Sequence, residues 1–123
     1  MVSRDTSNGP LSAATLHILL ALAGGNLHGY GIIKEITRSS EGHYRLGPGT
    51  LYDNLKKLMQ AGLVADAAQV SPPKRRSAAT KEDDRRFYTL TREGKDALAK
   101  EVDRLQSVVS QARLRLRESR ARV

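Results

Sequence analysis

The stretch LGPGTLYDNLKKLMQAGLV, residues 46–64, decides how this chain folds. Leu51, Leu55 and Leu58 recur at helical spacing, so they would share one buried face of a helix. Pro48 favours the first turn of that helix, where the hydrogen that proline lacks would have no partner anyway. The glycine near the end of the stretch suits the left-handed residue that follows a helix. The stretch therefore predicts an amphipathic helix that begins at Pro48.

Two further helices are predicted before this one. The first begins at Ser12, whose hydroxyl can cap a helix, and ends at the glycine pair that starts with Gly24. The second covers residues 29–40, and residues 44–46 form either a short strand or an extended link. The inner face of the first helix is predicted to hold Leu16, Leu19, Leu20 and Ala23, thickened by Ile18 and Leu22.

The segment after the third helix predicts a β-hairpin. Residues 63–70 and 86–90 have the composition of strands. Residues 71–85 between them are rich in proline, serine and charge, which is typical of a long turn. The candidate core residues of the second strand are Phe87 and Leu90.

A long last helix, capped by Thr91 and running to about residue 119, carries an apolar stripe. The stripe repeats at alternating steps of four and three residues, which is the period of a coiled-coil seam. A lone helix that extends from a small domain cannot bury such a stripe, so the stripe predicts a homodimer. Packing on the chain's own first helix is the alternative, and the two arrangements are compatible. The predicted dimerisation residues are Leu98, Val102, Leu105, Val109, Ala112 and Leu116.

The order of elements is helix, helix, helix, strand, strand, helix, which is that of a winged helix-turn-helix domain with a helix appended. The predicted fold class is mainly α with a small β-hairpin (α+β). The predicted division is a disordered N-terminus over residues 1–11, the winged helix-turn-helix domain over 12–90, the dimerisation helix over 91–119 and a basic tail over 120–123.

The chain of 123 residues has a formal net charge of +8. Such a balance indicates a polyanionic partner, either nucleic acid or an anionic lipid surface. The absence of cysteine excludes disulfides, thiolate chemistry and zinc–cysteine sites. The most apolar run, residues 16–23, is too short to span a bilayer, so we expect a cytoplasmic protein without a membrane partner.

Three blocks of this sequence resemble the PadR family of bacterial transcriptional regulators. LHGYGII at 27–33 resembles the start of the family's second helix, LGPGTLY at 46–52 resembles its recognition helix, and RFYTLTREG at 86–94 resembles the strand that enters its last helix. The resemblance implies a winged helix, a dimer joined through the C-terminal helix, and repression by binding to operator DNA. The single C-terminal helix resembles the subgroup with the shorter tail. Members differ in their small-molecule effectors, so the resemblance leaves the existence and identity of an effector open.

The start of the third helix has the features of a DNA reading head. A helix N-terminus presents unpaired N–H groups and a partial positive charge, which suit phosphate. Gly47 and Gly49 let the backbone approach closely, while Thr50 and Asn54 match base edges. Asp53 is unfavourable beside phosphate unless it pairs with a cytosine amine or a neighbouring lysine. The side chains better matched to phosphate are Tyr52, Lys56 and Lys57.

Basic residues also gather in the hairpin tip, which carries more Lys and Arg than Asp and Glu and suits the minor groove or flanking phosphates. On the second helix, Tyr30 and Lys34 resemble family positions that contact backbone phosphate. The arginines of the C-terminal tail are more consistent with a solvated surface than with DNA contact. The predicted DNA-binding residues are Tyr30, Lys34, Pro48, Gly49, Thr50, Tyr52, Asn54, Lys56, Lys57, Lys74, Arg75, Arg76 and Arg86.

The sequence argues against an enzyme. His17, His28 and His43 have no metal-binding spacing, and the glycines form no Walker or Rossmann phosphate loop. We therefore predict no catalytic residue, no metal site and no cofactor, with His17 in the packing and His28 at the turn before the second helix. The predicted function is a homodimeric repressor that binds a palindromic operator in double-stranded DNA. The alternatives are a winged-helix module that binds an acidic protein and a sequence-neutral architectural DNA binder.

Overall fold

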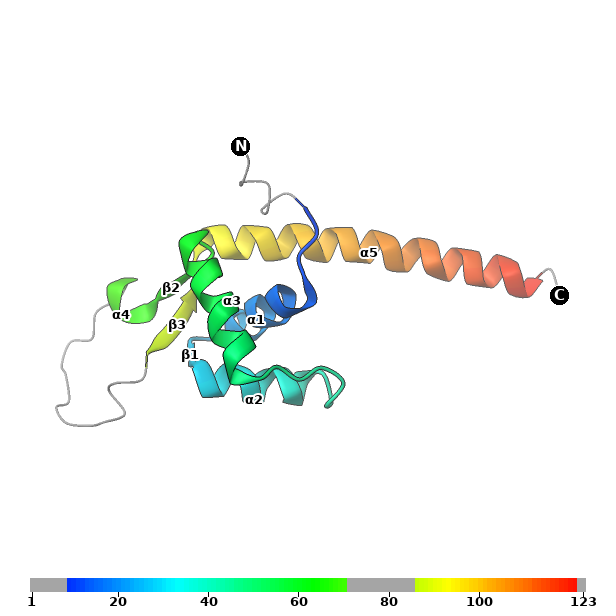
Figure 1. Ribbon diagram of the computed structural model, residues 1–123. Helices are drawn as coiled ribbons and strands as arrows, with labels where there is room; N and C mark the ends of the chain where they lie inside the picture. Colours follow the sequence, from blue (N-terminus) through cyan, green and yellow to red (C-terminus); the bar gives the residue numbers. More distant parts are fainter. Residues whose placement is uncertain (1–8, 71–85, 122–123) are drawn as a thin grey trace.

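The computed structural model describes residues 9–70 and 86–121 of the chain. The mainly helical fold with a small antiparallel sheet confirms the predicted class. Helices α1 to α3 pack together beside the sheet, and α5 passes over them and extends well beyond the domain (Figure 1). The elements are α1 (Ala13–Ala23), β1 (Leu27–His28), α2 (Gly29–Ser39), α3 (Pro48–Gln60), β2 (Val64–Asp66), α4 (Ala67–Val70), β3 (Phe87–Leu90) and α5 (Arg92–Ala121).

Helix α1 begins as predicted, because the Ser12 hydroxyl accepts a hydrogen bond from the Thr15 N–H at 3.1 Å. Its predicted inner face is partly wrong. Leu20 is 47% exposed and Ala23 is exposed as well. Nearly every residue of this helix is apolar, so periodicity cannot distinguish its faces; contacts with α2, α3, β3 and α5 decide them. The residues that these contacts bury are Ile18, Leu19, Ala21 and Leu22.

The sheet has three strands in the order β1-β3-β2, where the sequence predicted a two-stranded hairpin. The additional strand, β1, pairs antiparallel with β3, with Leu27 opposite Tyr88 and His28 opposite Phe87. A strand of two residues is too short to leave a periodic pattern. His28 then starts α2 as predicted, because its Nδ1 accepts a hydrogen bond from the Gly31 N–H at 3.2 Å.

The predicted strand over residues 63–70 is wrong beyond Asp66. The Asp66 carboxylate accepts a hydrogen bond from the Ala68 N–H at 2.9 Å, and the chain turns into α4. An aspartate offers the backbone a partner that competes with the strand ladder. The prediction of Phe87 as a core residue is also wrong, since Phe87 is 46% exposed. Alternate side chains of a strand point to opposite faces, and here Tyr88 and Leu90 point inward.

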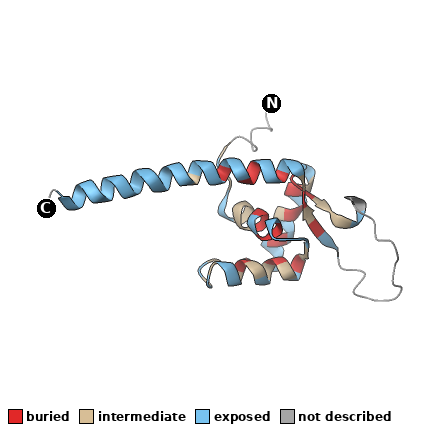
Figure 2. Cartoon of the chain, turned by 180° about the vertical axis from the view of Figure 1, so that it is seen from behind, coloured by how far each residue is buried: buried red, intermediate tan, exposed pale blue. Residues whose placement is uncertain are grey.

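Thr91 fixes the start of α5. Its hydroxyl donates to the Gly62 carbonyl at 2.7 Å and accepts from the Gly94 N–H at 2.9 Å, which confirms the predicted cap. The first turns of α5 lie in the core, whereas residues 102–121 are exposed except for the half-buried Leu105. Figure 2 shows this part of the helix as a long, mostly exposed extension. None of the helices within residues 9–70 and 86–121 is long and apolar enough to cross a membrane.

The ordered domain begins before Ser12. Leu11, which we expected in a disordered N-terminal segment, packs against the core. Its backbone also helps to lower the pKa of Glu101 in α5, whose carboxylate is paired with Arg104 at 2.6 Å. Glu101 is only 4% exposed, and the N-terminal segment lies against α5 at this residue.

Candidate nucleic-acid interface

The start of α3 is an exposed helix terminus. Leu51, Leu55 and Leu58 are buried, as predicted, and they hold the helix against the domain. Gly47, the N-cap residue, gives the terminus no side-chain hydrogen bond. The first-turn N–H groups therefore point toward an open surface, where the helix dipole favours a negative charge. The exposed residues on this helix and at its start are Gly47, Pro48, Gly49, Thr50, Tyr52, Asp53, Lys56, Lys57 and Gln60.

Asn54 is half-buried, and one hydrogen of its side-chain amide is already bonded. Its Nδ2 donates a hydrogen bond to the Thr50 carbonyl at 2.8 Å, within the same helix. An asparagine amide has two donor hydrogens and an acceptor oxygen. One hydrogen and the oxygen therefore stay available, which is the set that the edge of an adenine requires.

Tyr52 joins α3 to the start of α2. Tyr52 is 50% exposed, yet a Cβ on Gly29 would overlap its hydroxyl. Gly29 therefore makes room for the phenol. The next residue, Tyr30, is 63% exposed, and the Lys34 Nζ lies 5.4 Å from its ring centroid, within the range of a cation–π contact. The structure thus brings the start of α2, which carries the predicted Tyr30, against Tyr52 of α3.

Arg86, just before β3, is held by Asp66 at the end of β2. The Arg86 Nε lies 3.5 Å from the Asp66 Oδ2, and the side chains are 58% and 16% exposed. Next to this pair, burial raises the pKa of Tyr88 above its usual value, and Arg86 opposes the shift. The other predicted residues of the hairpin, Lys74, Arg75 and Arg76, lie outside the described residues.

Sequence reasoning missed two features of this surface. Asp66 was placed inside a long strand, where nothing marked it as a partner of Arg86. Phe87 was assigned to the core, but its ring stands edge-on to His28 with centroids 5.3 Å apart. The signal that would have found Phe87 is strand alternation, because Tyr88 and Leu90 already occupy the inward positions.

The predicted dimerisation stripe leaves the domain along α5. Leu98 is 9% exposed and belongs to the core, whereas Val102, Val109 and Leu116 are 46%, 47% and 61% exposed. Leu105 is half-buried and Ala112 is exposed.

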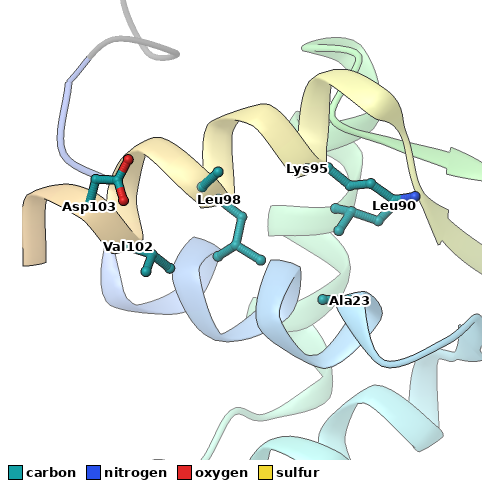
Figure 3. Close-up of a pocket in the computed structure, with 7 residues that line it drawn as sticks. Ala23, Leu90, Lys95, Leu98, Val102 and Asp103 are labelled. Atoms are coloured by element: carbon teal, nitrogen blue, oxygen red, sulfur yellow. The ribbon is translucent and has the colours of Figure 1, made fainter. Parts of the chain in front are cut away.

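Two hollows follow this stripe. One, of ≈ 340 Å³, lies where Leu98 and Val102 point from α5 toward α1 and Ala23 (Figure 3). The other, of ≈ 420 Å³, continues from Val102 to Arg113. From Val102 onward, the stripe is therefore a hollowed apolar surface without a partner among the described residues.

Comparisons with known proteins match this description. The model of the transcriptional regulator PadR-like family matches residues 18–100. The transcriptional regulator Rv3488 of Mycobacterium tuberculosis is 32% identical over 90 residues, which are 73% of each chain.

Two solved structures share the fold. A PadR family transcription regulator from Clostridium difficile has a TM-score of 0.65 at 21% identity, covering 85% of this chain and 99% of that one. Bacillus subtilis PadR, solved in complex with operator DNA, has a TM-score of 0.60 at 24% identity, covering 76% of this chain and 48% of that one. By the family model and the mycobacterial relative, this chain belongs to the PadR-like family, whose members are transcriptional regulators and not enzymes.

Proposed function

We propose that this protein is a homodimeric repressor that binds a palindromic operator in double-stranded DNA. The observation that carries the proposal is the exposed start of α3, where Gly47, Pro48, Gly49 and Thr50 form an open helix terminus. Lys56 and Lys57 are exposed farther along the same helix. Bacillus subtilis PadR, a neighbour in fold, was solved with operator DNA, which supports this assignment. Such a regulator works in the cytoplasm, as the sequence led us to expect.

In the proposed complex, the start of α3 enters the major groove. Thr50 and the unused amide groups of Asn54 face base edges, which supply sequence preference. Lysines and tyrosines position the protein on the phosphate backbone, which supplies affinity and salt dependence. The residues proposed for phosphate are Tyr30, Lys34, Tyr52, Lys56, Lys57 and Arg86, with Lys74, Arg75 and Arg76 in the hairpin tip.

The proposed dimer covers the apolar stripe of α5 with a second copy. From Val102 onward the stripe has no cover within the described part of the chain, and it continues across two hollows. Two joined copies would present their α3 helices to successive major grooves, about 34 Å apart. A small effector in the hollow between α1 and α5 would change that spacing and release the DNA.

The lysines of α3 provide a direct test. The measurement is the affinity for a duplex that the protein selects from a random library, over a range of salt concentrations. Log affinity falls linearly with log salt concentration, and each lost phosphate contact reduces the magnitude of this slope by about one. We expect Lys57→Ala to lower the slope by that amount and Lys100→Ala, on the exposed surface of α5, to leave it unchanged. Equal slopes for wild type and Lys57→Ala would refute the contact.

The same measurement separates the alternatives. A module that binds an acidic protein would bind duplex DNA only through its overall charge, so Lys57→Ala and Lys100→Ala would change the salt dependence equally. An architectural binder would have the salt dependence, but it would bind the selected duplex and a scrambled one equally.

A further inference from the structure

The ion pair at the base of the hairpin has an uneven geometry. Asp66 is only 16% exposed, whereas Arg86 is 58% exposed. Both oxygens of Asp66 are engaged, since Oδ1 accepts from the Ala68 N–H at 2.9 Å and Oδ2 lies 3.5 Å from the Arg86 Nε. The carboxylate is therefore fixed from two sides, while the guanidinium reaches into solvent.

The contact uses one edge of the guanidinium. Arginine has five N–H donors, and the one on Nε faces Asp66. The two Nη atoms carry the other four donors, in the planar arrangement that recognises phosphate with two parallel hydrogen bonds. A carboxylate beside Nε limits the rotation of the side chain, whose guanidinium also interacts with the Tyr88 phenol and is 58% exposed.

Arg86 belongs to the same surface as α3. The next residue, Phe87, lies opposite His28 in the sheet, and His28 caps α2. Gly29 follows His28 and receives the hydroxyl of Tyr52. The pKa of Tyr88 is raised by its burial and responds to both Arg86 and Tyr52, which places the two side chains around one phenol.

We propose that Asp66 is a positioning residue that directs the Nη groups of Arg86 toward a phosphate of the duplex bound by α3. This inference rests on the proposed function. The phosphate belongs to the DNA backbone, because the sheet register and the contact of Gly29 with Tyr52 place Arg86 on the side of the domain where Tyr52 of α3 lies. Asp66 itself makes no contact with the DNA.

Simple electrostatics predicts the opposite effect. A carboxylate near DNA repels phosphate, so its neutralisation should tighten binding and steepen the salt dependence. If Asp66 positions Arg86, its neutralisation weakens binding although the protein becomes more positive. The two accounts therefore differ in the sign of one measurement.

Asp66→Asn is the decisive variant, because asparagine keeps the size of the side chain and caps a turn as well as aspartate does. The measurement is the affinity for a duplex selected by the wild type, over a range of salt concentrations. We expect Asp66→Asn to bind about fivefold more weakly, as for a partly lost charged hydrogen bond. The magnitude of its salt slope should fall toward that of Arg86→Ala, which lacks the same phosphate contact. Asp96→Asn, which removes the same charge from the exposed surface of α5, should bind no more weakly than wild type.

Arg86→Lys separates positioning from a purely structural role. Lysine keeps the charge but has no Nε edge for the carboxylate to hold. In the Arg86→Lys background, the further change Asp66→Asn should no longer weaken binding. A structural role of Asp66 would weaken both backgrounds equally and would overturn the inference, as would an Asp66→Asn single variant that binds as tightly as wild type. If wild type itself has no salt-dependent affinity for duplex DNA, the proposed function fails and this inference fails with it.

Discussion

At the scale of single residues, close contacts fix how α5 joins the sheet. Gly94, in the first turn of α5, lies close to Leu63, the residue before β2. A Cβ on Gly94 would overlap the carbonyl oxygen of Leu63. Thr91 ties the same region together through Gly62. The direction in which α5 leaves the domain therefore depends on a glycine and a threonine.

Gly94→Ala should lower the free energy of unfolding by about 1–3 kcal/mol, as is usual for overpacking in a core. The added methyl group meets backbone, which cannot move aside as a flexible side chain can. Chemical denaturation at fixed protein concentration measures the loss. Gly24→Ala is the matched control, because its Cβ would have only an ordinary contact at 3.7 Å. Equal stabilities of the two variants would contradict the packing of α5 described above.

Glu101 predicts a dependence of stability on pH. Arg104 lowers the pKa of this carboxyl, burial opposes the shift, and the backbone of Leu11 lowers it further. A lowered pKa in the folded state means that the stabilisation is complete above the ordinary glutamate pKa and disappears as pH falls through the folded value.

Glu101→Gln should therefore have a lower melting temperature than wild type at neutral pH. The difference should shrink below about pH 4, where glutamate carboxylates take up protons. Thermal unfolding of both proteins from neutral to acidic pH gives the comparison, with Glu118→Gln on the exposed end of α5 as the control. A difference that stays constant with pH would show that the charge of Glu101 is irrelevant.

At the scale of elements, α5 has two parts with different surroundings. Its first turns pack on α1 and β3, and its second half carries an apolar stripe into solvent. An exposed apolar surface of this kind is unfavourable in water, so we expect a second copy of the chain to bury it.

Val109→Glu should convert the proposed dimer into a monomer, because it places a charge in the middle of the stripe. Ser107→Glu adds the same side chain about 200° around the helix and should leave the dimer intact. Sedimentation velocity at micromolar concentration reports the mass of each protein. A wild type that is monomeric, or a Val109→Glu variant that stays dimeric, would rule out the stripe as the interface.

The elements also indicate what the sequence can predict. Helix α3 was predictable because its buried leucines are separated by polar residues. The inner face of α1 was not, because an all-apolar helix has no distinguishable faces until its neighbours are placed. Strand β1 depends on its pairing with β3, which is not a local property. Helix α4 follows a local hydrogen bond between Asp66 and Ala68, but the composition of residues 63–70 favoured a strand.

The candidate site was likewise predictable only in part. The exposed terminus of α3 could be read from a proline, two glycines and a threonine in sequence. The contacts of Tyr52 with Gly29 and of Arg86 with Asp66 could not, because each joins residues on different elements. Sequence therefore predicted which groups could contact DNA, and only the fold indicates which of them are held in place.

At the scale of the whole molecule, the net charge of +8 favours DNA of any sequence, whereas a regulator must prefer one sequence. Phosphate contacts from lysine and arginine add to both kinds of binding equally. We propose that Thr50 and Asn54, at the start of α3, supply the preference by contacting base edges. The proposed function therefore depends on the ratio of two affinities, one for the operator and one for DNA of unrelated sequence.

The most direct test is the affinity of the full chain for a duplex that it selects from a random library, compared with a scrambled duplex of equal length at the same salt concentration. We predict a ratio of about a thousand or more, as for specific DNA-binding proteins. Asn54→Ala should reduce that ratio more than it reduces binding to the scrambled duplex. A ratio near one for wild type would contradict the account, because the protein would then bind DNA by charge alone.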